Sequence, residues 1–592
     1  MVSDPIFCIG YHHDALGRLL VKQYPDGTET TFSYNAQGRI TRAANPEISY
    51  SFNYDDAGRI TGVSDSRGWN LEYSYDAAGR RTGALTPDGR WVDYGYDPAG
   101  RLAEINDSGR TFSFRYDPAG RRAALVYPNG VKADYDYDPA GRLTGLVHRS
   151  GTAVIAAAVY DLDPVGNRLR LTGADQEIDY RYDRTHRLLE ANPVAPGGRP
   201  ATPGQEGQGR GQGRGLEQGG APQGGPQQPE FYQYDPAGNR QASHRHDEYR
   251  HDRNNRLLSA DQARYDYDAN SNLISKVTAE GETIYRWDFA NRLREVVMPD
   301  GTKVEFAYDP FGRRLEKRLA DPEGAETTTR YVYDHEDIVL ETDANGQIGN
   351  RYLHGPGIDE PLALYHGREI YYYHSDGLGT ITALSDQRAR LVQSYQYDAF
   401  GNPAPGGGNR IKQPYRYTGR EYDPDIGLYF YRARYYDPDI GRFISQDPIG
   451  FAGGDVNLYG YVLNNPVNWI DPWGLTRTFL IKQFVDKTIR SISQSYMRDI
   501  DPAGRRIISA GLGGAAAGAV GGAIVGVPAL GIGTVPSAIV GGAAGFSGGL
   551  LIQTGFEVVG LGQSIEELTN EIIDNFFNSI IDAPGDSSTP CK

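Results

Sequence analysis

This sequence contains very little cysteine and has no excess of positive charge. Only two of its 592 residues are cysteines, Cys8 and Cys591, which lie at opposite ends of the chain and are too few for a disulfide framework. The formal net charge is -16, whereas neutralising nucleic-acid phosphates takes clustered Lys and Arg. We therefore expect no nucleic-acid partner.

The N-terminal residues also lack the basic start and apolar run of a secretory signal. Export by the general pathway is therefore not encoded there. If the protein leaves the cell, we expect it to do so by a route that does not read a signal peptide.

Turn formers and tyrosine are abundant instead, with 75 Gly, 35 Pro and 42 Tyr. A short motif recurs every 20 or 21 residues, which is the period of a repeat architecture. Its first copies are "YNAQGRI" from Tyr34, "YDDAGRI" from Tyr54, "YDAAGRR" from Tyr75, "YDPAGRL" from Tyr96, "YDPAGRR" from Tyr116 and "YDPAGRL" from Tyr137.

Each copy predicts a strand end followed by a turn, because Asp, Pro and Gly stand where a type I turn prefers them. The runs between copies alternate aromatic and polar residues, as in Arg110 to Tyr116. Such hairpins bury an apolar face only by pairing with one another. We predict a mostly β protein whose residues 1–370 form a long, twisted antiparallel sheet wrapped into a shell. The apolar-poor stretch 192–230 is expected to be a disordered loop.

The tandem YDxxGR units resemble the YD, or Rhs, repeats of bacterial polymorphic toxins and of insecticidal toxin-complex C components. The sequence from Tyr371, with "YTGREYDPDIGLYFYRARYYDPDIGRFISQDPIGF" and "DPWGL", resembles the Rhs-associated core that closes those repeats. The resemblance covers residues 10 to 475 and implies a hollow β shell around a C-terminal toxin. Family shells usually use many more repeats, so a complete and an incomplete shell both stay open here. We assign residues 371–475 to the core.

Two Asp-Pro-x-Gly stretches begin at Asp447 and Asp471. By spacing alone they are two more turns. The resemblance implies instead that the core cuts itself between Leu475 and Thr476, at an aspartic-protease-like site using Asp447 and Asp471 with Arg442 assisting. Two close carboxyl groups suit this chemistry because one keeps a proton while the other acts as base.

No metal or cofactor is expected. The histidines of "SHRHDEYRHD", His244, His246 and His251, are interpreted as polar positions on repeat strands instead of metal ligands. His374 with Asp376 is interpreted as part of the core structure.

The segment 476–592 has a different composition. Residues 507–556 contain no charged side chain, and Pro528 and Pro536 divide them into two runs of about 20 residues, the length that crosses a bilayer as a helix. Glycines recur every fourth residue, which predicts a helical hairpin with a membrane packing face. These glycines are Gly514, Gly518, Gly522, Gly526, Gly541, Gly545 and Gly549. A flexible linker or a buried hairpin is the alternative.

The same segment contains no histidine, and its only cysteine is Cys591. Histidine-metal nucleases and His-based or Cys/His nucleophiles are therefore excluded for it. No catalytic site is recognised in it.

The sequence thus predicts a polymorphic toxin that is secreted or displayed on the cell surface. Its shell would release, by self-cleavage, a C-terminal membrane-active and pore-forming-like effector. The expected partners are a target membrane, an immunity protein and a secretion system that delivers the toxin. Two alternatives stay open: a surface adhesion protein anchored by the apolar hairpin, and an inactive toxin remnant.

Overall fold

The structure is a computed structural model that describes residues 8–195, 199–200, 228–404 and 410–475. The chain divides into two units, Met1–Tyr73 with Gly83–Arg477 and Ser74–Thr82 with Thr478–Lys592. Nearly all of the described strand residues belong to the first unit.

The repeat motif forms a turn in which its Asp, Gly and Arg residues are joined by hydrogen bonds. In the copy at Asp97, the Gly100 N–H donates to the Asp97 carbonyl at 2.8 Å, and Gly100 has φ 79. Asp97 Oδ1 accepts the N–H groups of Ala99 and Arg101, both at 2.9 Å, while Oδ2 accepts Arg101 Nε at 2.7 Å. The predicted turn is therefore present, with glycine at the left-handed position.

The arginine of the motif links successive repeats. The Arg101 guanidinium lies 4.5 Å from the ring centre of Tyr116 in the next copy, and the Tyr116 hydroxyl donates to the Leu102 carbonyl at 2.6 Å. The same arginine–tyrosine contact recurs at Arg18 with Tyr34, Arg39 with Tyr54, Arg121 with Tyr137, Arg256 with Tyr267 and Arg292 with Tyr308. Tyrosine and arginine thus hold neighbouring hairpins in register.

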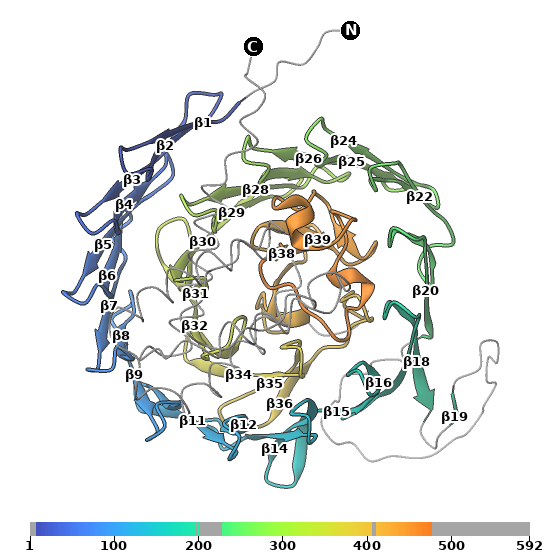
Figure 1. The fold of residues 1–592 in the computed structure, drawn as a ribbon, viewed down its shortest axis with the longest axis horizontal. Helices are drawn as coiled ribbons and strands as arrows, with labels where there is room; N and C mark the ends of the chain where they lie inside the picture. The colour runs from blue at the N-terminus through green and yellow to red at the C-terminus, as the bar shows by residue number, and fades with distance from the viewer. Residues whose placement is uncertain (1–7, 196–198, 201–227, 405–409, 476–592) are drawn as a thin grey trace, which may run out of the picture. The chain divides into compact units, whose positions relative to one another are not determined.

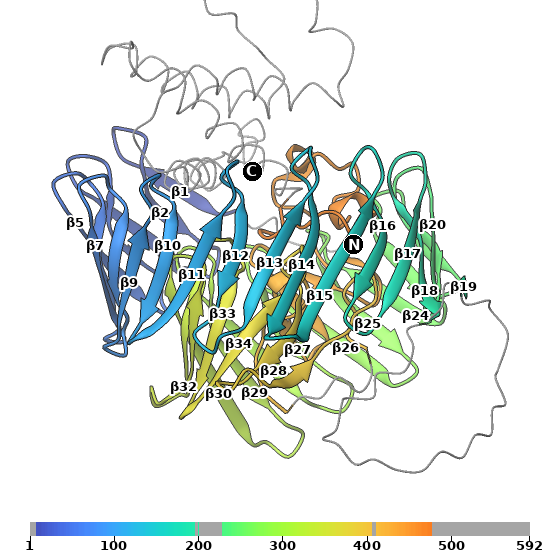
Figure 2. The ribbon, with the colours of Figure 1, turned by 90° about the horizontal axis from the view of Figure 1, so that it is seen from below.

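The described residues form two large antiparallel sheets and one small one (Figures 1 and 2). The first has 21 strands: β1 Gly10–His13, β2 Leu19–Gln23, β3 Glu29–Tyr34, β4 Ile40–Ala44, β5 Ser49–Tyr54, β6 Ile60–Asp65, β7 Asn70–Tyr75, β8 Arg81–Leu85, β9 Trp91–Tyr96, β10 Leu102–Asp107, β11 Arg110–Tyr116, β12 Arg122–Val126, β13 Lys132–Tyr137, β14 Leu143–Ser150, β15 Ala153–Leu162, β16 Arg168–Gly173, β17 Glu177–Tyr182, β18 Leu188–Ala195, β19 Arg199–Pro200, β20 Glu230–Tyr234 and β21 Arg240–Ser243.

The second sheet has 15 strands: β22 Tyr249–His251, β23 Leu257–Ala260, β24 Ala263–Tyr267, β25 Leu273–Thr278, β26 Gly281–Trp287, β27 Leu293–Val297, β28 Lys303–Tyr308, β29 Arg314–Ala320, β30 Glu326–Asp334, β31 Asp337–Thr342, β32 Ile348–His354, β33 Pro361–His366, β34 Glu369–Ser375, β35 Ile381–Ser385 and β36 Leu391–Ser394. The small sheet contains β37 Glu421–Asp423, β38 Leu428–Tyr431, β39 Arg434–Asp437 and β40 Arg442–Phe443. Three short 3-10 helices accompany it: η1 Tyr417–Gly419, η2 Gly450–Gly453 and η3 Val462–Asn464.

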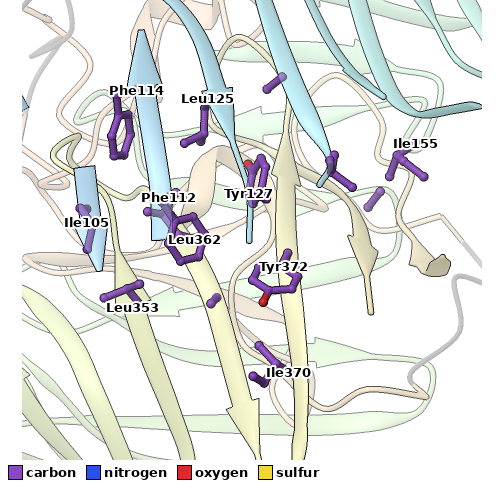
Figure 3. Close-up of a cluster of buried hydrophobic side chains, with 14 of the residues drawn as sticks. Ile105, Phe112, Phe114, Leu125, Tyr127, Ile155, Leu353, Leu362, Ile370 and Tyr372 are labelled. Carbon is purple, nitrogen blue, oxygen red and sulfur yellow. The ribbon is translucent and has the colours of Figure 1, made fainter. Parts of the chain in front are cut away.

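The sheets share their cores. One buried cluster contains Phe112 and Leu125 of the first sheet and Tyr127, which directly follows β12. These side chains pack against Leu362 and Tyr372 of the second sheet (Figure 3). A second cluster packs the strands from β22 to β28 against the small sheet. The alternating residues of each strand therefore bury one face against another layer, and the predicted wrapped antiparallel sheet is confirmed.

The structure shows which strands flank the predicted loop 192–230 and the predicted start of the core at residue 371. Strands β18 and β20 pair directly, with Glu190 opposite Phe231. The stretch 192–230 therefore connects two strands that are neighbours in the sheet. Its first residues belong to β18; most of the remainder, where disorder was predicted, lies outside the described residues. The core is expected to start at residue 371, which lies within β34. Because β34 pairs with β33, the second sheet continues across this predicted boundary.

Candidate functional site

Asp447 and Asp471 lie together in the structure, although they are far apart in the sequence. Arg434 in β39 joins them: its Nη2 is 3.0 Å from Asp447 Oδ2 and 3.4 Å from Asp471 Oδ2. Asp447 is 9% exposed and Asp471 is 2% exposed. Two buried carboxyl groups therefore share one guanidinium.

Both aspartates are also the turn residues that their spacing predicts. The Gly450 N–H donates to the Asp447 carbonyl at 2.9 Å, and the Gly474 N–H points to the Asp471 carbonyl at 3.3 Å. Asp447 Oδ1 additionally accepts the Ile449 N–H at 3.0 Å. The turn and the paired site are thus one structure, because each turn fixes the backbone from which a carboxyl group points inward.

The bond predicted to be cut begins at the last described residue of this region, Leu475. Asp471 Oδ1 accepts the Leu475 N–H at 3.0 Å. A Cβ placed on Gly453 would lie 2.8 Å from Asp447 Oδ2 and 2.8 Å from the Leu475 carbonyl oxygen. These two oxygens are therefore no further apart than twice that distance, and the absence of a side chain at Gly453 permits the approach.

The tight turn between β38 and β39 holds the segment before Leu475. The Ala433 N–H donates to the Trp473 carbonyl at 3.2 Å, and Arg432 donates to the Pro472 carbonyl at 2.6 Å. Arg434 Nε donates to the Gly474 carbonyl. Gly474 has φ 67, and a Cβ there would lie 2.4 Å from the Tyr431 carbonyl. Only glycine fits this position.

Burial sets the electrostatics of the pair. It raises the pKa of Asp447 to about 7, an effect that Arg434 opposes and that the charge of Asp471 reinforces. The cavity lined by Arg434, Asp447, Asp455 and Asp471 has a volume of about 20 Å³, which is room for one water molecule. The arrangement can keep one carboxyl group protonated beside a carbonyl and admit a single water.

Comparison with known proteins agrees with the repeat pattern. The family model described as the Teneurin YD-shell matches residues 9–106, 54–162 and 220–467, which is more than half of the chain. This chain belongs to the YD-shell family. Residues 476–582 match a different model, a family of unknown function termed DUF6861.

Relatives of this YD-shell chain include a protein named as a nuclease and a protein named as a toxin. It is 31% identical over 229 residues to the tRNA3(Ser)-specific nuclease WapA of Bacillus spizizenii, covering 37% of this chain and 9% of that protein. It is 31% identical over 258 residues to double-stranded DNA deaminase toxin A of Burkholderia cenocepacia, covering 38% and 18%. The chain therefore spans less than a fifth of either relative. The resemblance to Rhs/YD-repeat toxins is confirmed at the level of the family.

A solved structure shares the fold. The structure titled TcdB2-TccC3-Cdc42 superposes with a TM-score of 0.61 at 20% identity, covering 80% of this chain and 28% of that one. This likeness concerns the fold alone. The names of the relatives include nucleic-acid enzymes, so the exclusion of a nucleic-acid partner stays a prediction from charge.

The arginine expected to assist the aspartates was Arg442, and the structure places Arg434 there instead. Arg442 Nη2 donates to the Asn255 carbonyl, and its guanidinium lies 4.8 Å from the Tyr459 ring centre. The sequence gives no signal that separates the two, because the core is rich in arginine. Only the turn between β38 and β39 decides which one faces Asp447.

The histidines are held by other groups. His246 lies 3.0 Å from Asp261 Oδ2 and 3.2 Å from Asp439 Oδ2, and His374 contacts His148 and Ser385 in the interior. Among the described residues no group of three or more His, Cys, Asp or Glu side chains is placed to hold a metal.

Several predicted site residues lie outside the described residues. They are Thr476 and the glycines Gly514, Gly518, Gly522, Gly526, Gly541, Gly545 and Gly549. Within the described part of the chain, no helix has the length and apolar character needed to cross a membrane.

Proposed function

We propose that this YD-shell chain is part of an Rhs-type toxin that cuts itself between Leu475 and Thr476. The observation that carries the proposal is the joint placement of Asp447 and Asp471 on Arg434, with Leu475 bound by one carboxyl group and close to the other. Residues 1–370 would then be the shell, 371–475 the core and 476–592 the released segment.

The chemistry follows from the two environments. Asp447, with its pKa raised to about 7, keeps a proton and donates it as a hydrogen bond to the Leu475 carbonyl oxygen, which polarises the bond. Asp471, held ionised by Arg434, takes a proton from the water that attacks the Leu475 carbonyl carbon. When the carbon–nitrogen bond breaks, this proton passes to the amine of Thr476.

A denaturing gel tests the proposal. Wild type should give two bands, with the smaller fragment beginning at Thr476, whereas Asp447→Asn and Asp471→Asn should each give one full-length band. Asp425→Asn is the matched control and should be cut, because Asp425 lies in a similar Asp-Pro turn but is 36% exposed and pairs with Lys317. A folded wild-type chain that stays whole would overturn the proposal.

We further propose that the released segment acts on a membrane. Its support is the charge-free run 507–556, in which glycines are spaced four residues apart from Gly514 to Gly526 and from Gly541 to Gly549. The segment matches a family model of its own, which is described as a family of unknown function. The same proposal includes two partners, a secretion system that delivers the toxin and an immunity protein.

Two measurements test this second step: expression of residues 476–592 in a bacterium, and addition of the same segment to vesicles filled with a dye. Rapid growth arrest in the first together with dye leakage in the second supports a membrane toxin. Stable binding to vesicles without leakage would favour the anchored adhesion protein, and neither effect would favour an inactive remnant. A point substitution of Gly518→Leu, which blocks close helix packing, should abolish the leakage.

A further inference from the structure

A second cavity lies where the three sheets meet, and Arg442 faces it. Arg240 at the start of β21, His251 at the end of β22 and Arg442 in β40 line it, together with Asn239 and Gly441. Each of the three sheets therefore contributes a basic or titratable side chain to one small space.

The two arginines are buried without a carboxylate partner. Arg240 is 5% exposed and Arg442 is 6% exposed. Among the described residues, no carboxylate pairs with either guanidinium within 4.0 Å, and Arg240 Nη2 and Arg442 Nε donate no hydrogen bond. A buried charge without a partner is costly, and buried arginines are normally paired.

Other buried arginines of the same region follow that rule. Arg434 pairs with two aspartates, Arg420 with Asp359 at 2.5 Å, and Arg314 with Glu421. Arg240 and Arg442 instead lie against rings, with Arg240 4.2 Å from the Phe400 ring centre. Rings stabilise the faces of a guanidinium but do not accept hydrogen bonds from its edge. The Asn255 carbonyl accepts one from Arg442 Nη2, whereas Arg240 Nη2 and Arg442 Nε have no acceptor.

The charge around the cavity is positive. Burial, and then Arg442 and Arg240, lower the pKa of His251 to about 3, so this histidine is neutral at pH 7. Asp252, which acts in the opposite direction, is bound to Arg256 at 2.7 Å. No nearby group therefore cancels both arginine charges.

Two buried carboxyl groups near Arg240 do not cancel both arginine charges either. Glu230 and Asp398 feel the charge of Arg240. Burial and the repulsion of Asp398 raise the pKa of Glu230 to about 8, and burial also raises the pKa of Asp398, so the low-dielectric interior disfavours the negative charge of both groups.

We propose that this cavity binds one monoatomic anion, with chloride as the physiological ligand. The cavity volume of about 10 Å³ admits a particle of about the size of one water, which excludes phosphate, sulfate and carboxylates. Arg240 Nη2 and Arg442 Nε supply the charge-assisted N–H donors. A side chain on Gly441 would overlap the Arg240 guanidinium, so glycine keeps this donor in place.

The anion would fasten the core to both sheets. It neutralises charges that β21 and β40 bring together, and it acts without any covalent step. Anion binding does not require self-cleavage, although Asn457 and Gly460 line both this cavity and the aspartate site.

Anomalous scattering from crystals of the full-length protein soaked in bromide is the direct test. We expect one bromide peak between the Arg240 and Arg442 guanidinium groups. Wild type should also unfold at a temperature higher by about 2 °C or more in sodium chloride than in sodium gluconate of equal ionic strength.

Arg442→Met should lose this chloride-dependent shift. Arg101→Met is the matched control and should keep it, because Arg101 is a partly exposed arginine already paired with Asp97 and does not line the cavity. No bromide peak, or a peak without any chloride effect on unfolding, would overturn the proposal, since the latter is binding at crystal concentration only. The crystal measurement stands even if a variant does not fold.

Discussion

At the scale of single residues, the site depends on one arginine and one glycine that no turn motif requires. Arg434 neutralises two buried carboxyl groups and also donates to the carbonyls of Leu458 and Gly474. Gly453 leaves space in which Asp447 and the Leu475 carbonyl approach each other. Substitutions at these positions separate the roles of charge and of space.

Arg434→Gln should abolish self-cleavage. Without the guanidinium, Asp471 loses the charge that keeps it ionised, and the two carboxyl groups repel each other. The measurement is the fraction of cut chain on a denaturing gel. Arg314→Gln is the matched control, because Arg314 is also buried and pairs with buried carboxyl groups away from Leu475. Cleavage by a folded Arg434→Gln chain would contradict the assigned role.

The rate of cleavage should depend on pH through Asp447. Its protonated form acts as the acid, and its pKa is about 7, so the rate should decrease as the pH rises through 7 and fall about tenfold per pH unit above pH 8. Pulse-labelled chain made by cell-free translation and transferred to buffers of different pH gives this profile. A rate that rises between pH 7 and pH 9 would show that Asp447 acts as the base.

Gly453→Ala should slow cleavage at least about tenfold, because its Cβ would push Asp447 Oδ2 away from the Leu475 carbonyl. Gly454→Asn is the matched control: Gly454 has φ 79 with open space around it, and asparagine tolerates this conformation. Equal rates for both variants would mean that Gly453 does not set the approach. Their unfolding temperatures check that both variants fold.

At the scale of elements, the YDxxGR turn ties each hairpin to itself and to the next. In the copy at Tyr54, Asp55 accepts the Arg59 N–H at 2.9 Å and Arg59 Nε at 2.7 Å. The neighbouring Asp56 is exposed. The same turn thus contains one aspartate that holds the backbone and one that faces solvent.

Asp55→Ala should therefore loosen this turn, and Asp56→Ala should not. Hydrogen exchange of the Gly58 and Arg59 amides should become about tenfold faster in Asp55→Ala, since the backbone loses its side-chain acceptor. Exchange rates measured by mass spectrometry of the peptide that spans β5 and β6 check this. Equal effects of the two variants would contradict the turn assignment.

At the scale of the whole molecule, the two large sheets meet at a buried histidine pair. His148 of β14 and His374 of β34 lie 3.1 Å apart through their Nδ1 atoms, with the Tyr127 ring against both. Burial lowers the pKa of His148 to about 4, an effect that a hydrogen bond to the Ser375 carbonyl and the charge of Asp134 oppose. Burial also lowers the pKa of His374, and the charge of His148 adds to this effect. Both side chains are neutral at pH 7.

The contact between the sheets should weaken in acid. A histidine with a lowered folded-state pKa stabilises the fold fully above pH 6.5, and this stability is lost as the pH falls from 6.5 toward 4. The loss for His148 is about 3 kcal/mol. His148→Gln should show a smaller fall of the unfolding temperature between pH 6.5 and pH 4.5 than wild type, whereas His335→Gln, at an exposed position, should match wild type. Identical pH profiles for wild type and His148→Gln would contradict this.

The period of YDxxGR by itself determined the hairpins and their turns, because Asp, Gly and the alternating aromatics act within a few residues of each other. The two Asp-Pro-x-Gly stretches likewise marked Asp447 and Asp471 as candidates. Only the tertiary structure decided that Arg434, not Arg442, joins them, and that Arg442 faces a cavity of its own. These choices depend on which face of a hairpin meets another sheet, and packing between distant segments sets that, not local sequence preference.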